Sequence, residues 1–303
     1  MANATKLAAS TPFRGILVGW PGAGKTGALA CLVSAGFKVR YLDFDGGNYG
    51  PMLKYSDPKM HKNVDIISFA DKLVNGARFI ETAGLPTAFN DAMKMLIHWK
   101  YKDADGTEVD LGRSKDWGPD TIVVIDTLDG MGDTAFRRAQ SMLNKTPLNT
   151  TRTVWGVAMA DQENAVRILA NPSNGYHLII LSHLTMVGPK DVEKDDDEVT
   201  KELKERAMDI LPTRLYPAAL GQKLPPKIGG AVPTLLLVER VVKGGKVKRV
   251  IRSDTGSELD TKIPSATDLG VLPIETGMID IFNAVTPGVA ACLAWKAPVG
   301  AKP

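Results

Sequence analysis

The sequence predicts an α/β fold in which a mainly parallel central sheet is flanked by helices. Three observations predict it. Short apolar runs typical of strands alternate along the chain with segments of helical periodicity. Two of these runs, residues 121–125 and 178–181, are apolar throughout, which is typical of parallel strands buried on both faces. A glycine-rich segment, residues 19–24, directly follows the first apolar run of the chain, residues 13–18. Strands that alternate with helices favour parallel pairing with helices on both faces.

Each expected element follows from the local pattern. Apolar runs predict strands over 13–18, 38–43, 63–69, 121–125 and 178–181. Helical periodicity predicts helices over 25–35, 86–101, 130–143 and 154–169. The apolar face of the second of these helices is expected to consist of Phe89, Met93, Leu96 and Ile97. Residues 102–119 are polar and contain glycines, which favours a loop or hairpin insertion.

The C-terminal third predicts a β-hairpin and then a small extension. Residues 234–242 and 246–252 flank Gly244 and Gly245, a pair typical of tight hairpin turns. We expect a flexible arm over 1–12, one main domain over 13–255 and a partly disordered extension over 256–303, whose end is rich in proline and glycine. The 303 residues, 44% hydrophobic and 23% charged, have the composition of an ordinary globular protein.

Composition also limits the class of protein. Cys31 and Cys292 lie far apart and form no CxxC pair, which argues against a disulfide framework or a zinc site and fits a reducing cytoplasm. No apolar run reaches the roughly 18 residues that a membrane helix needs, and residues 1–12 lack the order of a signal peptide. We therefore expect a cytoplasmic protein without a membrane partner. The net charge of +3 is compatible with nucleic-acid binding but does not require it.

A complete phosphate-binding motif follows the first predicted strand. Residues 19–26 fit the pattern G-x-x-x-x-G-K-[ST] (Walker A), whose glycines let backbone N–H groups turn toward phosphates at the start of a helix. Lys25 is expected to reach the β- and γ-phosphates, and the Thr26 hydroxyl is expected to ligate Mg²⁺. The strand before the motif and the helix after it disfavour a plain glycine-rich turn. The motif predicts ATP and Mg²⁺ as cofactors, with the nucleotide bound by Gly19, Trp20, Pro21, Gly22, Ala23, Gly24, Lys25, Thr26 and Gly27.

A second motif supports the first. Asp126 ends the apolar run 121–125, at the place of a Walker B aspartate, and is expected to hold Mg²⁺ beside Thr26, directly or through water. Thr127 is a further candidate at the same metal. An aspartate after an apolar strand is also a common loop or cap residue, and it is the preceding Walker A motif that favours the metal role.

The order of the motifs resembles the RecA-type ATPase core. The P-loop is followed by strands ending in Tyr41-Leu42-Asp43-Phe44-Asp45-Gly46-Gly47, in Val124-Ile125-Asp126-Thr127 and in Leu181-Ser182-His183. More closely, the chain resembles the phage-encoded, minimal RecA/RadA-like ATPases linked to single-strand annealing and recombination. The resemblance covers residues 13–255 and implies a RecA-like P-loop NTPase core with a C-terminal β-hairpin extension.

The resemblance also implies roles for three residues. Asp45 matches the place of the acidic residue that activates the attacking water, although the family commonly has glutamate there; Asp43 is the alternative base. Both carboxylates could instead only cap the turn. His183 matches a polar sensor that contacts the γ-phosphate and passes its state to the loop that follows, and a purely structural role is its alternative. The implied catalytic set is Lys25, Asp45, Asp126 and His183.

The resemblance implies single-stranded DNA as a partner, but one segment argues against a simple transfer of RecA's mode of binding. Residues 195–198 are all acidic and would repel phosphates. They are expected to form a solvated loop, or else a partner-docking or autoinhibitory one. Basic residues lie elsewhere, at Arg137, Arg138, Lys145, Arg152, Arg240, Lys243, Lys246, Lys248 and Arg249. The last five would form a basic ribbon along a phosphate backbone, or a lysine-protected edge strand. Trp155 and Tyr176 are candidates for base stacking or for a core or interface role.

The sequence thus predicts an ATPase, stimulated by single-stranded DNA, that acts in phage recombination or annealing as a homo-oligomer. RecA-like enzymes use a neighbour's cation at the γ-phosphate, and Arg214, Lys223 and Lys227 are candidates for it. A single-strand DNA-binding protein is a further possible partner. The alternatives are a helicase or packaging motor, a nucleotide-kinase-type phosphotransferase and a nucleotide-switched binding protein. The kinase needs an arginine-rich lid, for which residues 190–206 are too acidic.

Overall fold

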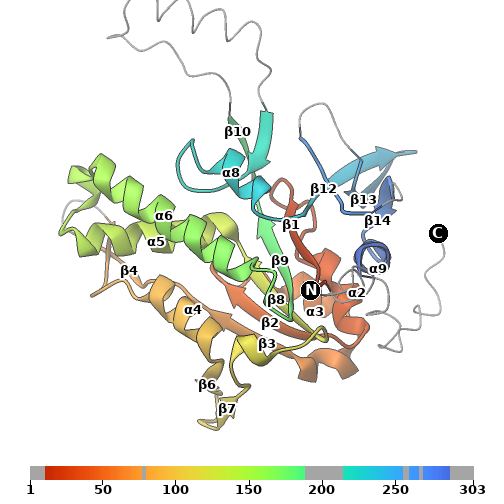
Figure 1. The fold of residues 1–303 in the computed structure, drawn as a ribbon, viewed down its shortest axis with the longest axis horizontal. Coiled ribbons are helices and arrows are strands. Elements are labelled where there is room, and N and C mark those ends of the chain that lie inside the picture. Colours follow the sequence, from red (N-terminus) through yellow and green to blue (C-terminus); the bar gives the residue numbers. More distant parts are fainter. Residues whose placement is uncertain (1–10, 77–79, 188–213, 255–258, 266–268, 287–303) are drawn as a thin grey trace, which may run out of the picture.

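An eight-stranded, mainly parallel sheet forms the centre of the molecule (Figure 1). The structure is a computed structural model, and it describes residues 11–76, 80–187, 214–254, 259–265 and 269–286. The strand order is β14-β13-β12-β1-β9-β8-β2-β3. Strands from β3 to β12 pair in parallel, whereas β13 and β14 pair antiparallel. The strands are β1 (Arg14–Val18), β2 (Lys38–Asp43), β3 (Val64–Ser68), β8 (Thr121–Asp126), β9 (His177–Ser182), β12 (Thr234–Lys243), β13 (Lys246–Arg252) and β14 (Val271–Pro273).

Helices cover both faces of this sheet, and three small ribbons project from it (Figure 1). The α-helices in the described part of the chain are α2 (Ala30–Ser34), α3 (Gly50–Tyr55), α4 (Ala88–Ile97), α5 (Leu128–Met142), α6 (Arg152–Leu169), α8 (Pro225–Gly230) and α9 (Gly277–Val285). The ribbons pair β4 (Leu73–Asn75) with β5 (Ile80–Thr82), β6 (Lys100–Lys102) with β7 (Glu108–Asp110), and β10 (Leu184–Val187) with β11 (Arg214–Pro217). Short 3-10 helices lie at Gly27–Leu29, Pro58–Asn63, Ser114–Asp116 and Pro147–Asn149.

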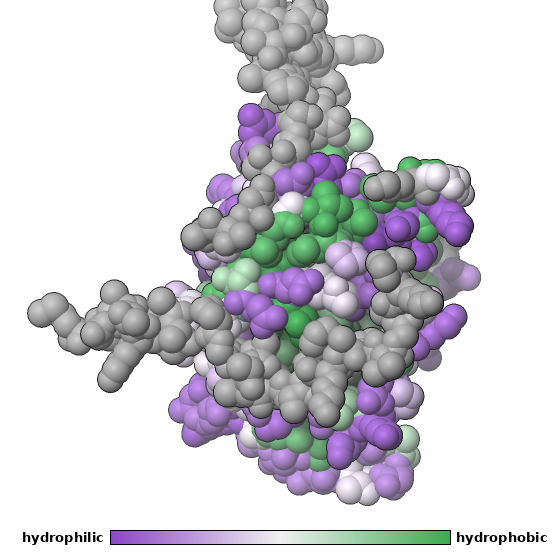
Figure 2. Space-filling view, turned by 90° about the vertical axis from the view of Figure 1, so that its right-hand side faces the viewer, coloured by the Kyte–Doolittle hydropathy of each residue, from purple (hydrophilic) through white to green (hydrophobic). Residues whose placement is uncertain are grey.

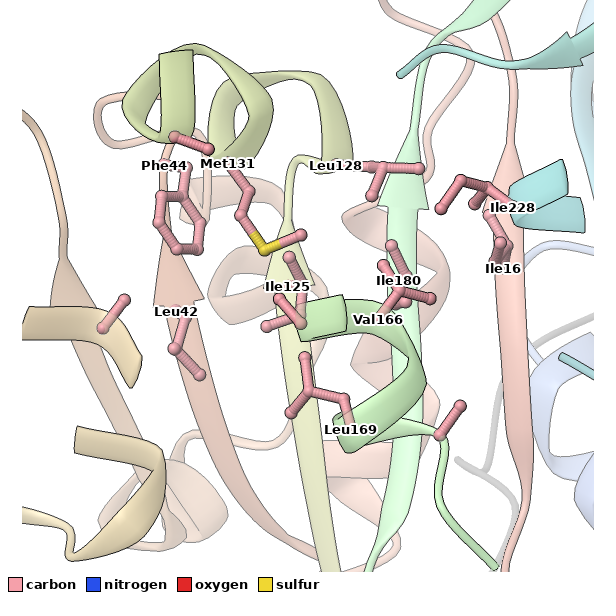
Figure 3. Close-up of a cluster of buried hydrophobic side chains, with 14 of the residues drawn as sticks. Ile16, Leu42, Phe44, Ile125, Leu128, Met131, Val166, Leu169, Ile180 and Ile228 are labelled. Atoms are coloured by element: carbon pink, nitrogen blue, oxygen red, sulfur yellow. The ribbon is translucent and has the colours of Figure 1, made fainter. Parts of the chain in front are cut away.

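The sheet is buried on both faces because alternate side chains of each strand point to opposite sides. On one side, a large apolar cluster fills the space between the sheet and helices α4, α5, α6 and α8. Figure 3 shows part of it, with Leu42, Ile125 and Ile180 from three strands meeting Met131 and Val166 from α5 and α6. This packing explains why the central strands are apolar along their whole length.

A second apolar cluster joins the opposite face of the sheet to α2, α3 and α9. Its centre is aromatic: Phe282 of α9 stacks on Phe13 with ring centroids 4.6 Å apart and meets Phe37 edge-on at 5.5 Å. His177 is enclosed in the same group, and its Nδ1 accepts a hydrogen bond of 2.8 Å from the Phe13 N–H. These contacts attach α9, near the C-terminal end, to the first strand of the sheet.

The predicted fold class is confirmed: the chain is α/β, with a mainly parallel sheet, helices on both faces and a hairpin near its C-terminal end. The hairpin of β12 and β13 continues the central sheet, because β12 pairs with β1. The described parts of the expected extension, β14 and α9, pack on the main sheet. Residues 1–10 and 287–303 lie outside the described residues, and the domain boundaries stay predictions.

One predicted apolar face is wrong in part. Ile97 is 68% exposed, whereas Phe89 and Leu96 are buried as expected. The reason is that α4 ends at Ile97 and the chain becomes extended at His98, which turns the fully buried Trp99 into the core in its place. None of the helices in the described part of the chain is long and apolar enough to cross a membrane.

Candidate nucleotide-binding site

The predicted site residues meet at the carboxyl ends of β1, β2, β8 and β9. In an open parallel sheet this edge is the usual place for a ligand, because the loops that leave neighbouring strands converge there. The P-loop leaves β1, the segment with Asp43 and Asp45 leaves β2, Asp126 ends β8, and His183 follows β9. The fold therefore brings together four segments that lie far apart in the sequence.

The P-loop has the backbone geometry that its glycines allow. Gly22 and Gly24 have φ angles of +73° and +110°, which disfavour any residue with a side chain. The loop is held at its base, because the Gly19 N–H donates a hydrogen bond of 3.2 Å to the Ser182 carbonyl. A Cβ at Gly19 would lie only 2.3 Å from the carbonyl oxygen of Val238, so β12 packs directly against the loop. Gly27 then begins the 3-10 turn that leads into α2.

Lys25 lies inside this loop. Its side chain is buried, and its Nζ donates hydrogen bonds to the carbonyls of Gly19, at 2.9 Å, and Trp20, at 3.4 Å. Burial lowers the pKa of the ammonium, while the charges of nearby carboxylates, first Asp126 and then Asp129 and Asp45, act in the opposite direction. The ammonium thus offsets the charge of these three carboxylates, which we call the acidic corner. Its partners are neutral carbonyls, which a phosphate oxygen can replace.

Thr26 and Asp126, the two predicted metal ligands, are in contact. The Thr26 hydroxyl donates to Oδ2 of Asp126 at 3.2 Å, and the Tyr41 hydroxyl donates to the same oxygen. Burial raises the pKa of Asp126; the hydrogen bond from Tyr41 opposes this, and the charge of Asp45 adds to it. A buried carboxylate whose charge is this costly is a group that a cation would stabilise.

This donor set fits Mg²⁺ rather than a metal held by protein ligands alone. Mg²⁺ in nucleotide sites typically takes one or two protein oxygens and completes its shell with phosphate oxygens and water. Thr26 and Asp126 supply two such oxygens at the mouth of the P-loop. The described residues contain no group of three or more histidine, cysteine or acidic side chains that could hold a metal by themselves. Thr127 takes another role, because its hydroxyl caps α5 by accepting from the Gly130 N–H at 3.2 Å.

The two candidate bases after β2 differ in surroundings. Asp43 is buried and fully engaged: Oδ1 accepts from the N–H groups of Asp45 and Gly46, both at 3.0 Å, and Oδ2 accepts from the Ser68 hydroxyl at 2.6 Å. Asp45 is exposed, and Asn48 donates to its carboxylate at 3.0 Å. Its charge still acts on Lys25, Asp126 and His183. Asp43 therefore caps the turn, and Asp45 is the carboxylate that stays accessible at the site.

His183 forms an ion pair that the sequence did not predict. Its Nδ1 lies 2.8 Å from Oδ2 of Asp129, in the first turn of α5. This hydrogen bond raises the pKa of His183 against the effect of burial. For Asp129, burial alone would raise the pKa, but the bond from His183 lowers it overall. Oδ1 of Asp129 is buried without a partner among the described residues.

Two contributing residues, Tyr41 and Asp129, were missed by sequence reasoning. Tyr41 of β2 pairs with Val124 of β8, and Val124 lies two residues before Asp126. The long side chain of Tyr41 can therefore reach the Asp126 carboxylate. A tyrosine two residues before Asp43 was the local signal. Asp129 lies in the first turn of α5, three residues after Asp126 ends β8, and this proximity in sequence to the Walker B position was the available signal.

Two of the basic DNA candidates are engaged in ion pairs. Arg138 pairs with Asp161 and also donates to Asn90, and Arg137 lies 4.0 Å from Asp71. Arg214, a candidate for the cation at a neighbour's γ-phosphate, pairs with Asp260 at 2.9 Å. Tyr176 is buried. Trp155, by contrast, is 40% exposed beside a surface cavity on α5 and α6. The acidic run 195–198 and the segment 190–206 lie outside the described residues.

Comparison with known proteins supports no more than a fold likeness. No known family model and no curated protein match the chain. Among solved structures, a KaiC-like protein of Pyrococcus horikoshii is similar at 9% identity and a TM-score of 0.39, covering 87% of this chain and 89% of that one. The flagellar accessory protein FlaH of Methanocaldococcus jannaschii is similar at 10% identity and a TM-score of 0.31, covering 82% and 81%. At these values the likeness says nothing about activity.

Proposed function

We propose that this protein is a RecA-like P-loop ATPase that binds ATP with Mg²⁺ and hydrolyses it. The observation that carries the proposal is the meeting of Lys25, Thr26 and Asp126 at one edge of the sheet, 3.2 Å apart for the last two, although Asp126 lies 100 residues away in sequence. Phosphoryl transfer needs a phosphate-binding loop, a metal-binding hydroxyl and a carboxylate that holds the metal. The Walker A loop, Thr26 and the buried Asp126 match these three parts.

Each residue has a role that its surroundings support. Lys25 would exchange its two carbonyl partners for the β- and γ-phosphate oxygens. Thr26 and Asp126 would hold Mg²⁺, which neutralises charge on the transferred phosphoryl group when bound. Asp45 would orient the attacking water, because it is the accessible carboxylate, and Asn48 would hold its side chain in place. His183 would sense the γ-phosphate from the end of β9, with Asp129 fixing its ring.

Single-stranded DNA is the partner that we propose for the far end of α5 and α6. A cavity of about 370 Å³ opens there between Phe136, Arg137 and Trp155. Trp155 lies on Phe136 with centroids 4.4 Å apart, and Lys145 and Arg152 have no ion-pair partner among the described residues. An exposed indole in one cavity with Arg137, whose ion-pair contact with Asp71 is long at 4.0 Å, suits a base and its phosphate. Stacking is typically worth about 1–3 kcal/mol per base.

We further propose that the ATPase works as a homo-oligomer in recombination or annealing, in the cytoplasm. The side of the molecule with β12, β13 and α9 presents a hydrophobic area bordered by hydrophilic residues (Figure 2). Val242 and Val247 at the tip of the hairpin are 75% and 62% exposed. Exposed apolar side chains of this kind are typical of association surfaces. Lys223 and Lys227 are exposed and could supply a cation to a neighbouring subunit.

The test is the rate of ATP hydrolysis with and without single-stranded DNA, for the wild type, Lys25→Ala and Trp155→Ala. We expect turnover in the wild type that DNA increases, loss of turnover in Lys25→Ala, and basal turnover without stimulation in Trp155→Ala. Ile168→Ala is the matched control for the tryptophan, since Ile168 is also exposed on α6. If DNA changes neither turnover nor oligomeric state, the recombination proposal is wrong. Phosphate transfer to a nucleoside would indicate a kinase, and directional strand separation a motor.

A further inference from the structure

The hairpin of β12 and β13 lies on the other side of the P-loop from the acidic corner. In the sheet, β1 has β12 as one neighbour and β9 as the other. Asp126, Asp129, Asp45 and His183 all belong to the β9, β8 and β2 side. The β12 side brings an arginine to the loop instead.

Arg249 of β13 packs directly on a P-loop glycine. A Cβ at Gly24 would lie 2.7 Å from Cδ of Arg249 and 3.4 Å from its Nε, so the arginine side chain lies directly against the glycine. The side chain is exposed, and its guanidinium has no ion pair or hydrogen-bond partner among the described residues. An unpaired guanidinium beside a ring of inward-pointing N–H groups is suited to an anion in that ring.

A second arginine faces the first. Arg240 of β12 is directly opposite Arg249 in the antiparallel register, so the two side chains lie on the same face of the hairpin. Arg240 is also exposed and without an ion-pair partner in the described part of the chain. Like charges directly opposite each other destabilise a β-ribbon. The arrangement is costly in the free protein and becomes favourable when an anion lies between the pair and the loop.

We propose that Arg249 binds the phosphates of a nucleoside triphosphate or diphosphate held in the P-loop of its own chain, with Arg240 adding to the positive field. The inference rests on the proposed nucleotide site and adds to it a residue from the far end of the sequence. It assigns Arg240 and Arg249 to the nucleotide, whereas Val242 and Val247 lie on the same face nearer the turn, and it leaves DNA to the Trp155 surface. Because the contact is within one chain, it does not depend on assembly.

The test is calorimetric titration of ATP and of ADP, with Mg²⁺ and without DNA, into wild type, Arg249→Ala and Arg249→Gln. Arg249→Gln keeps a polar side chain of similar reach and reports the charge. For both nucleotides we expect both variants to bind about 10- to 100-fold more weakly, the size of one charge-assisted hydrogen bond. Arg113→Ala is the charge control, since Arg113 is an exposed arginine before the amino end of β8, at the opposite edge of the sheet. Circular dichroism confirms that each variant is folded.

A mixing experiment separates action within a chain from action between chains. Arg249→Ala has an intact Lys25, and Lys25→Ala has an intact Arg249. If the arginine acts within its own chain, mixing the two variants restores neither affinity nor turnover. Recovery on mixing would overturn the inference, and so would affinities of the Arg249 variants within twofold of the wild type. A wild type that binds neither nucleotide would instead remove the proposed function on which the inference rests.

Discussion

The two sides of the phosphate-binding loop carry opposite charge. On the β9 and β8 side, Lys25 faces Asp126, Asp129 and Asp45. On the β12 side, Arg249 stands beside the same loop with Arg240 opposite it in the hairpin, and neither has a carboxylate partner among the described residues. We infer from this difference that cation binding and phosphate binding are assigned to opposite sides of the loop. In our proposal, the acidic side would hold a cation and orient water, and the basic side would hold phosphate.

The largest expected effect comes from the acidic side. Asp126→Asn removes the carboxylate that faces the Thr26 hydroxyl, and we expect Mg²⁺-dependent ATP turnover to fall by about 10³-fold or more, as for loss of a main electrostatic group. Because burial raises the pKa of Asp126, the charged carboxylate destabilises the free protein above that pKa. The variant without nucleotide should therefore melt at the same or a higher temperature than the wild type. A clearly lower melting temperature would contradict this account of Asp126.

The loop between the two sides is tested by Gly24→Ala. The substitution places a Cβ at a φ of +110° and 2.7 Å from both Arg249 and Ile274. We expect a loss of about 1–3 kcal/mol in the free energy of unfolding, the usual cost of such backbone strain, together with weaker ATP binding. Gly22→Ala is the matched control, because Gly22 also has a positive φ but its Cβ would meet nothing within 4 Å. Equal losses in the two variants, measured by denaturant unfolding, would contradict a close approach of Arg249 and Ile274 to Gly24.

A smaller effect is expected from Tyr41→Phe. The Tyr41 hydroxyl donates to Asp126 and thereby holds down a pKa that burial raises. Removing the hydroxyl raises this pKa further, so the acid limb of Mg²⁺-dependent ATP binding moves to higher pH. At neutral pH we expect affinity to fall by about fivefold, the equivalent of one hydrogen bond near 1 kcal/mol. Binding titrations at several pH values check this, and an acid limb that stays in place or moves to lower pH would disprove the role of Tyr41.

The smallest expected effect concerns His183 and Asp129. The hydrogen bond raises the pKa of His183 and lowers that of Asp129, so the pair stabilises the fold fully between the unfolded pKa values of aspartate, about 3.9, and histidine, about 6.5. This stability is lost as pH rises through the folded pKa of His183 or falls through that of Asp129. Asp129→Asn should lower the pKa of His183 in an NMR titration and reduce stability by less than about 1 kcal/mol at about pH 5, where both partners are charged, because the pair is partly exposed. An unchanged pKa of His183 would mean that the pair is not formed in solution.

Much of the fold could be predicted because its pattern is local. Strands β8 and β9 contain the continuous apolar runs 121–125 and 178–181, and the P-loop motif predicts a strand before it and a helix after it. Helix α9 was not predicted, because it is held in place by a residue far away in the sequence. Phe282 stacks on Phe13, and no local pattern indicates a contact across most of the chain. The end of α4 was misjudged because Trp99, not Ile97, fills the core.

The candidate site divides in the same way. Lys25, Thr26 and Asp126 could be named from motifs, since their chemistry requires fixed residue types at fixed spacing. Tyr41 and Arg249 could not, because their contacts with Asp126 and Gly24 depend on strand register and on which strands are neighbours in the sheet. Asp43 was named as an alternative base, but only the structure shows that its oxygens are engaged by Asp45, Gly46 and Ser68.

All the roles proposed for this site require that the P-loop binds a nucleoside triphosphate through Lys25. This requirement is tested most directly by titrating ATP with Mg²⁺ into the wild type and into Lys25→Ala by calorimetry, with Lys102→Ala as an exposed-lysine control from the β6–β7 ribbon. We predict saturable binding by the wild type and the control, and a loss of about 100-fold or more in Lys25→Ala, since the lysine is buried in the loop. Equal affinity in all three proteins, or no binding in any, would contradict the account.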